Sequence, residues 1–587
     1  MTTMERNTLL RVSTLAMFIL ALAIPGGAQE SKVSSDLRQS GGGQTKVIIQ
    51  YSSQPTSADQ DRITKRGGSV HGRLSAVNGF HASLTPAQIM HLAKDPKVTY
   101  ISPDRPVGGY MHNAAQAVNA PYAWSLGLDG SNMAVAVIDS GIQDTATVAT
   151  AKKIAAKSGI HGNDDLNQGS SDASRVVYSQ SWVNDGAGAL DMYGHGTHVA
   201  GIIAGNGQES TGPQYTKTFK GIAPNVNLVN LRVLDAQGMG TDSSVIAAIQ
   251  TAIQLKDKYN IRVINLSLGR PVFESYTVDP LCQAVEAAYQ AGIVVVVAAG
   301  NDGRNNSLGS NGYGTITAPG NDPYAITVGA MKSMDTAARA DDLIATYSSK
   351  GPTAIDHIVK PDLVAPGNRQ VSLNSFGASL NAAYSSNVVA VNFYRKGDNS
   401  KISPAYYTLS GTSMAAPVVS GAVALLLQAN PAMTPDQVKA RLMKTAYKTF
   451  PSYSSYTDLS TGVTYTSQYD AFTVGAGYLD IQAALSSTDT GSGTAKSPTA
   501  QYDSATNSVY FVGDSSAMWG SSAMWGASAV WGSNVFVGSQ SAMWGSSAMW
   551  GSSAMWGASA MWGSSAMWGC STQVSSESIG ILINGEK

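Results

Sequence analysis

Cysteine and charge are both scarce in this chain of 587 residues. Its two cysteines exclude a disulfide-rich scaffold and a four-cysteine zinc site. Charged residues make up 13% of the sequence, against about 25% in an ordinary soluble protein. A net charge of −1, without a basic stripe, argues against a nucleic-acid partner. No apolar run reaches the roughly 18 residues that a membrane span needs.

The N-terminal segment has the layout of a secretory signal. Arg6 and Arg11 form a positive region, and Val12–Ile24 is a mostly apolar stretch of 13 residues. Small residues follow and favour cleavage after Ala28. Because the apolar stretch is too short for a membrane anchor, we expect residues 1–28 to be a signal peptide and the protein to be secreted.

The next segment, residues 29–112, is predicted to be a small α+β domain with its core at about 44–107. Its sequence contains strand-like runs at Lys46–Tyr51 and Lys97–Ile101, and Thr85 is placed to cap a helix. A core of about 60 residues is marginal on its own. We therefore expect the segment to fold against a partner surface, as a prodomain does.

The central stretch, residues 113–487, alternates apolar strands with amphipathic helices. This order predicts βαβ units around a parallel sheet, with sites at the carboxyl ends of the strands. The predicted strands are 133–138, 227–233, 263–268, 293–298 and 325–328, and the predicted helices are 197–204, 242–256, 279–291 and 413–428.

Three motifs in this stretch carry the side chains of a nucleophilic site. Asp139 ends an apolar strand, His195 stands at the helix start Gly-His-Gly-Thr-His-Val-Ala-Gly, and Ser413 stands in Gly-Thr-Ser-Met-Ala-Ala-Pro. A hydroxyl nucleophile needs a base, and the base needs a partner that fixes its tautomer. Free N–H groups at a helix start also favour an oxyanion. Pro417 is expected in the first turn of its helix, where proline is tolerated.

Together with Val137–Ile142 and Val296–Asn301, these motifs resemble the subtilisin-like serine proteases, or subtilases. The resemblance covers residues 113–487 and implies a parallel sheet flanked by helices. It implies a serine endopeptidase whose catalytic residues follow in the order Asp, His, Ser, and it places the oxyanion-binding asparagine on Asn301. Residues 29–112 similarly resemble the inhibitory prodomain of the family, which implies an autoprocessed precursor.

The same resemblance implies that substrate adds as a strand between two edges of the chain. An uncharged segment at 316–320 would complete the pocket for the residue before the scissile bond, so we expect an apolar or broad preference. No cofactor is required for the chemistry. The two edges are Ser267-Leu268-Gly269 and Gly238-Met239-Gly240.

The sequence does not identify any metal ligands. Loops near 143–160 and between 367 and 411 are longer than in small subtilisins, so the usual calcium ligands of the family do not carry over. Structural calcium stays open, and solvated loop acids are the preferred interpretation of the candidates. These candidates are Asp164, Asp165, Asp185 and Asp191.

Two further residue types invite a metal or disulfide interpretation. His198 lacks the glutamate of a zinc-binding His-Glu-x-x-His helix, so we expect a packed structural histidine. Cys282 and Cys570 would either pair or leave Cys282 as a small buried thiol, and the second interpretation is preferred.

The C-terminal part is divided into a polar segment at 488–504, predicted to be a linker, and residues 505–587. A hexapeptide, Ser-Ser-Ala-Met-Trp-Gly, recurs in the latter and contains eight of the ten tryptophans. An even step keeps Trp on one face of a strand but spreads it around a helix. A stacked β-structure, a ligand-binding or self-associating surface and a low-complexity segment all stay open.

The leading hypothesis is a secreted serine endopeptidase that acts on protein substrates and is inhibited by its own prodomain. The repeat would attach it to a cell surface or to other copies. Two competing hypotheses are a binding or assembly protein with an incidental subtilase domain, and a metalloprotease.

Overall fold

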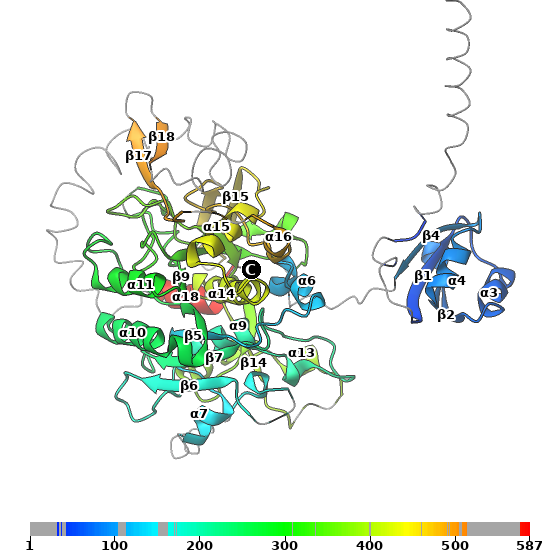
Figure 1. The fold of residues 1–587 in the computed structure, drawn as a ribbon, viewed down its shortest axis with the longest axis horizontal. Coiled ribbons are helices and arrows are strands. Elements are labelled where there is room, and N and C mark those ends of the chain that lie inside the picture. The colour runs from blue at the N-terminus through cyan, green and yellow to red at the C-terminus, as the bar shows by residue number, and fades with distance from the viewer. Residues whose placement is uncertain are drawn as a thin grey trace, which may run out of the picture. The chain divides into compact units, whose positions relative to one another are not determined.

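The computed structural model describes residues 32–34, 37, 43–103, 113–150, 162–512 and 576–586. Within 162–512 it leaves out 170, 172, 308, 335, 398, 400, 460, 490, 492 and 504–507. The chain forms two compact units that divide between residues 108 and 109 (Figure 1). The predicted signal peptide, the Trp repeat and Cys570 lie outside the described residues.

The smaller unit is a four-stranded antiparallel sheet, in the order β2-β3-β1-β4, with two helices. Thr85 caps α4 as its sequence predicts: its side chain accepts from the Gln88 N–H, and the Gln88 side chain accepts from the Thr85 N–H at 2.7 Å. The elements are β1 (Thr45–Tyr51), α3 (Ser57–Thr64), β2 (Ser69–Leu74), β3 (Gly79–Leu84), α4 (Pro86–Leu92) and β4 (Val98–Pro103).

The larger unit is built on an eight-stranded sheet. Seven strands follow the order β11-β10-β9-β8-β5-β7-β6, and β12 also pairs with β10. Every pair is parallel except β10 with β11, which confirms the predicted α/β class. The strands are β5 (Ala134–Asp139), β6 (Val176–Ser181), β7 (Asn227–Arg232), β8 (Ile261–Leu266), β9 (Val294–Ala298), β10 (Ile326–Lys332), β11 (Leu343–Ile344) and β12 (Leu363–Pro366).

Helices cover both faces of this sheet because its strands are apolar on both sides. Along β5, Val135 and Val137 join the core on one face, whereas Ala136 and Ile138 join the core on the other. The first face carries α9 (His195–Ala204) and α14 (Thr412–Ala429). The second carries α10 (Asp242–Tyr259) and α11 (Pro280–Gln290), which lie next to each other in Figure 1. All four helices were predicted to within three residues at either end, and the largest difference is at α10, which runs to Tyr259 instead of 256.

Among the described residues, α14 is the one helix long and apolar enough to cross a membrane. It is a core helix here, since 83% of its span is buried inside the larger unit.

Shorter elements surround the sheet and include three two-stranded antiparallel sheets, β13–β14, β15–β16 and β17–β18. The elements are α5 (Asn113–Ala117), α6 (Ala120–Ser125), α7 (Thr145–Thr150), β13 (Gln370–Leu373), α12 (Ser379–Ala383), α13 (Val391–Tyr394), β14 (Tyr406–Leu409), α15 (Pro435–Thr445), β15 (Tyr453–Thr457), β16 (Thr464–Gln468), α16 (Ile481–Ser486), β17 (Thr499–Asp503), β18 (Ser508–Val512) and α18 (Ser576–Asn584).

The polar segment 488–504, predicted to be a linker, is instead docked in part on the larger unit. Ser497 is 2% exposed, and its hydroxyl donates to Asp362 at 2.6 Å and accepts from Lys439 at 2.8 Å. The Pro498 carbonyl accepts from the Val359 N–H. The prediction was wrong because buried charges need polar partners, so a polar composition does not by itself mean exposure.

Candidate active site

Asp139 and His195 meet at the carboxyl end of β5. Asp139 is the last residue of β5, and His195 is the first residue of α9. The carboxylate Oδ1 and the ring Nδ1 are 2.8 Å apart, and both side chains are buried. Gly196 permits this approach, because a Cβ there would lie 2.3 Å from the Gly141 carbonyl oxygen. Burial lowers the pKa of His195, but the charge and hydrogen bond of Asp139 outweigh it and raise the pKa above its usual value.

Ser413 is the second residue of α14 and is partly exposed. Its hydroxyl donates to the Ser267 carbonyl oxygen at 3.2 Å, and the Ser267 hydroxyl donates to the Ser413 carbonyl oxygen at 2.8 Å. These two bonds tie the start of α14 to the residue that follows β8. Ser413 therefore lies at a helix N-terminus, where main-chain N–H groups are available to an anion.

Asn301 lies beside the start of α14. Its side-chain oxygen accepts from the Thr412 N–H at 2.9 Å and from the Thr412 hydroxyl at 3.1 Å. Those bonds orient the side chain, leaving its amide nitrogen as the donor end. That nitrogen is 3.2 Å from where a Cβ on Gly411 would stand. An oriented amide donor next to a nucleophile is the chemistry of an oxyanion hole.

Pro417 departs from the sequence-based expectation. Because α14 begins at Thr412, Pro417 is its sixth residue and lies beyond the first turn. The Ser413 carbonyl, which a residue with an N–H at 417 would satisfy, accepts from the Ser267 hydroxyl instead. The helix tolerates proline here because a side chain from another element supplies the missing donor.

The two predicted substrate-binding runs lie in connections at the carboxyl ends of β7 and β8. Met239 is 39% exposed, and Gly240 and Gly269 are also exposed. Arg270 and Ala318 exchange two main-chain hydrogen bonds, of 2.9 and 2.8 Å, so the predicted pocket segment 316–320 lies against the end of one run. The other residues of the two substrate-binding runs are Ser267, Leu268 and Gly238.

Arg270 is the charged residue that these main-chain bonds bring to the pocket segment. Its guanidinium pairs with Asp242 at 2.9 Å and with Asp279 at 2.8 Å. The pairing compensates its charge, which is consistent with the apolar preference expected from the sequence.

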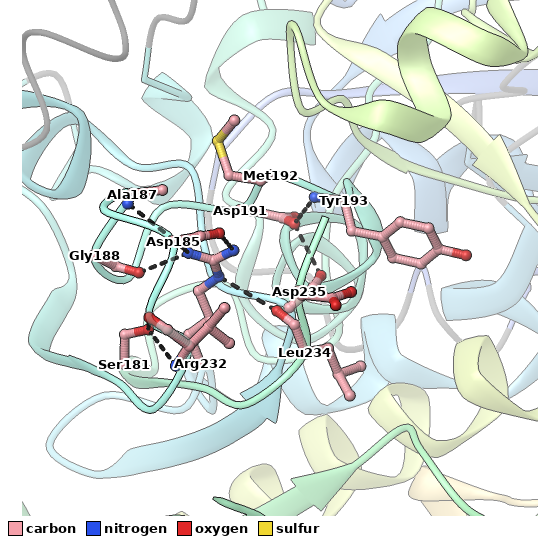
Figure 2. A network of polar contacts seen from close by, with 12 residues as sticks. Ser181, Asp185, Ala187, Gly188, Asp191, Met192, Tyr193, Arg232, Leu234 and Asp235 are labelled. Carbon is pink, nitrogen blue, oxygen red and sulfur yellow. Dashed lines mark hydrogen bonds and ion pairs between the residues drawn. The ribbon is translucent and has the colours of Figure 1, made fainter. Parts of the chain in front are cut away.

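Asp191, which the sequence offers only as a candidate metal ligand, holds the turn before His195. Its buried carboxylate accepts from the N–H groups of Gly194 and Thr197 and from the Ser140 hydroxyl, at 2.7–2.8 Å. Figure 2 shows it with its other donor, the Tyr193 N–H. Burial raises the pKa of Asp191, and the hydrogen bonds act in the opposite direction. The available signal was an acid two and three residues before main-chain donors, as in an Asx turn.

Tyr193 is a second residue that the sequence did not single out. Its ring centroid is 6.4 Å from that of His195. A Cβ on Gly238 would lie 2.6 Å from the Tyr193 ring, so Tyr193 contacts one predicted substrate edge. Burial and neighbouring carboxylates raise its pKa to about 12, which keeps the hydroxyl neutral at physiological pH.

The long insertion between 367 and 411 packs against this same turn. Its residues Ser379 and Leu380 donate main-chain N–H bonds of 3.0 Å to the carbonyls of Met192 and Tyr193. The Ser375 hydroxyl donates to the Asp191 carbonyl at 3.1 Å. The insertion therefore supports the segment that carries His195.

The four candidate calcium ligands do not assemble into a cation site. Asp185 is paired with the buried guanidinium of Arg232 (Figure 2), and the Asp191 oxygens are occupied by hydrogen-bond donors. Asp164 is exposed, whereas Asp165 and Asp191 are buried, so the solvated-acid interpretation was wrong for those two. Across the described part of the chain, no three His, Cys, Asp or Glu side chains are grouped to hold a metal ion. These acids therefore do not fit calcium.

His198 is the packed histidine that the sequence predicts. It is fully buried, and its Nε2 donates to the Gln370 and Tyr407 carbonyls, each at 3.1 Å. Burial lowers its pKa to about 3, which keeps the ring neutral. Cys282 is also buried, and its thiol donates to the Asn321 side-chain oxygen at 3.3 Å.

Comparison with known proteins identifies the family of both units. Residues 130–478 match the profile described as the subtilase family, and residues 33–108 match the peptidase inhibitor I9. The serine protease AprX of Bacillus subtilis (strain 168) is 33% identical over 381 residues, which are 64% of this chain and 75% of that protein. Subtilisin E of the same organism is 32% identical over 398 residues, covering 67% and 82%.

A third relative is the extracellular serine proteinase of Thermus sp. (strain Rt41A), 32% identical over 369 residues that cover 63% of this chain and 71% of that protein. The family profile spans more than half of the chain. The chain therefore belongs to the subtilase family of serine endopeptidases, and an I9-type prodomain precedes its catalytic domain.

Proposed function

We propose that this subtilase is a secreted endopeptidase in which Ser413 is the nucleophile, His195 the general base and Asp139 the residue that orients the imidazole. The carrying observation is the buried 2.8 Å hydrogen bond between Asp139 and His195. Asn301 and the main-chain N–H of Ser413 are the proposed oxyanion donors. The orientation of Asn301 by Thr412 supports that role.

In the proposed reaction, Ser413 Oγ attacks the peptide carbonyl carbon while His195 Nε2 takes the hydroxyl proton. The negative charge on the carbonyl oxygen is stabilised by Asn301 and the helix N-terminus. When the C–N bond breaks, His195 returns the proton to the leaving amine. Water then repeats the sequence at the acyl ester and regenerates Ser413.

Substrate is proposed to bind as an extended strand along Ser267-Leu268-Gly269 and Gly238-Met239-Gly240. The partial exposure of both runs supports this placement, and main-chain bonds would supply most of the affinity. The side chain before the scissile bond would enter a pocket lined by 316–320. The absence of charge from that segment supports an apolar or broad preference.

The precursor is proposed to start with a signal peptide and to be cleaved by its own active site after the I9 prodomain. Similarity to the Thermus relative, which is named an extracellular serine proteinase, supports secretion. The Trp repeat is proposed to bind a surface or other copies, because residues 515–570 contain tryptophans without any charged side chain.

Fluorophosphonate labelling with intact-mass analysis tests the nucleophile. We expect label on a shortened wild-type chain, and an unlabelled, unprocessed chain for Ser413→Ala. A matched control is Ser243→Ala, an exposed serine on α10, which should label and process like the wild type. Label and hydrolysis that persist in Ser413→Ala would contradict the proposed function.

A further inference from the structure

The C-terminal helix α18 and the residues that follow it are packed into the larger unit. α18 and the residues after it carry two buried isoleucines, Ile581 and Ile583, which are 5% and 7% exposed. Figure 1 shows α18 in red within the larger unit. The following carboxylate, that of Glu586, is 1% exposed. A carboxylate buried to this extent needs specific partners.

Glu586 has such partners on two segments. Its Oε1 accepts from the Arg304 guanidinium at 3.0 Å and from the Thr346 N–H at 2.8 Å. Its main chain is bound as well, because the Asn368 side chain accepts from the Glu586 N–H at 2.7 Å and donates to the Glu586 carbonyl at 2.8 Å. The last residues therefore occupy a fixed position.

Arg304 connects Glu586 to the loop that carries Asn301, the proposed oxyanion donor. It lies three residues after Asn301, and the residues between them are bonded to the segment after Thr346. The Gly303 N–H donates to the Tyr347 carbonyl at 2.8 Å, and the Asp302 N–H donates to the Ser349 hydroxyl at 3.0 Å. Because Glu586 binds both Arg304 and Thr346, it holds the segment 301–304 against the segment 346–349.

The same peptide also contacts the turn before Ser413. The Leu582 carbonyl accepts from the Ser410 N–H at 2.9 Å. Asn368, which holds the Glu586 main chain, follows Gly367, and the Gly367 carbonyl accepts from the Gly411 N–H at 2.9 Å. The peptide therefore touches both segments that the proposed mechanism brings to the reacting carbonyl.

We propose that Glu586 is a positioning residue for peptide hydrolysis, acting through Arg304 on the Asn301 loop, and that the C-terminal peptide 579–586 is part of the catalytic domain. The inference rests on the proposed roles of Asn301 and Ser413. A donor displaced from the oxyanion lowers the rate of the chemical step and leaves ground-state binding largely intact.

A double-mutant cycle between Glu586→Ala and Asn301→Ala tests the inference in the full-length enzyme. Active sites are counted by fluorophosphonate titration, so that unfolded protein does not contribute. We expect Glu586→Ala alone to lower kcat about tenfold with KM within about twofold. In the Asn301→Ala background the further loss should be less than about twofold, since the donor that Glu586 positions is already absent.

Two other variants complete the design. Asn584→Ala is the matched control, because Asn584 is exposed on the same peptide, and its kcat should be unchanged. Glu586→Gln keeps an oxygen acceptor for Thr346 and should recover part of the rate. If Glu586→Ala does not fold, Glu586→Gln replaces it in the double-mutant cycle with Asn301→Ala.

A wild-type kcat in Glu586→Ala, or the same fractional loss with and without Asn301, would overturn the inference. The proposed function fails separately, through activity retained by Ser413→Ala.

Discussion

The Ser267 hydroxyl donates to the Ser413 carbonyl oxygen across 2.8 Å, in the place of the hydrogen bond that Pro417 cannot make. Ser267 is itself held by Asn265, whose amide donates to the Ser267 hydroxyl at 2.9 Å and accepts from the Ser420 hydroxyl at 2.8 Å. Two residues of α14, Ser413 and Ser420, are therefore linked by hydrogen bonds through Ser267 and Asn265. This linkage fixes the N-terminal part of the helix against β8.

Ser267→Ala should lower the free energy of unfolding by about 1–3 kcal/mol, because it leaves the Ser413 carbonyl unsatisfied. In a Pro417→Ala background the loss should be smaller, since the alanine brings back a main-chain N–H donor. Urea denaturation of the fluorophosphonate-inactivated enzyme measures both without autolysis. Losses that simply add in the double variant would show that Ser267 does not replace the missing donor.

The pH profile should depend on the contact between Asp139 and His195. A base must be neutral, so kcat/KM should rise with pH through a midpoint above about 6.5, the ordinary value for histidine. In Asp139→Asn, burial lowers the pKa of His195 without the opposing charge of Asp139, and Asp191 is left as the smaller opposing charge, so the acidic limb should move to lower pH. The maximal rate should fall by about 10⁴-fold, because the tautomer is no longer fixed. An unmoved limb would contradict this account.

The same pKa shift has a consequence for stability. Because the pKa of His195 is raised in the folded enzyme, its protonation contributes stability that is fully present below the unfolded value, about 6.5. This contribution is lost as pH rises through the folded value. As pH rises through the folded pKa of His195, kcat/KM should therefore increase while this contribution to stability decreases. Melting temperatures measured over the same pH range would detect the decrease.

Asp191→Ala should reduce both stability and kcat, because it removes the acceptor for the Gly194 and Thr197 N–H groups at the start of α9. We expect a loss of about 2–4 kcal/mol for several buried donors left without a partner. Asp191→Asn should be milder, since one oxygen remains. Asp257→Asn, at an exposed position on α10, is the control. Wild-type kcat in a folded Asp191→Ala enzyme would exclude a role in placing His195.

How much of this structure the sequence predicts depends on the range of the interactions. β5, α9 and α14 are marked by local apolar runs and motifs, and the expected positions of Asp139, His195 and Ser413 follow from them. Ser267 and Ser413 are 146 residues apart, and Asn368 and Glu586 are 218 apart. No periodicity encodes such pairings. Composition also fails where polar side chains are buried with charges, as Ser497 is between Asp362 and Lys439.

The C-terminal peptide should remain with the active enzyme even when the chain is cut within the repeat. Ile581, Ile583 and Glu586 are buried in the larger unit. We therefore expect their docking to persist without the covalent connection to Val512. A recognition site for a sequence-specific protease, inserted after Gly538, allows one cut. We expect native mass spectrometry to show both fragments together with full activity, and denaturing conditions to separate them.

Glu586→Ala should weaken this association after the same cut, because the peptide loses its bonds to Arg304 and Thr346. Activity should then fall as the cut enzyme is diluted, since dissociation is concentration-dependent. Adding a synthetic peptide of residues 576–587 with the native Glu586 should restore it. Asn584→Ala, cut in the same way, should stay associated and active. A cut enzyme that releases the native peptide yet keeps its full kcat would contradict the assignment of this peptide to the catalytic domain.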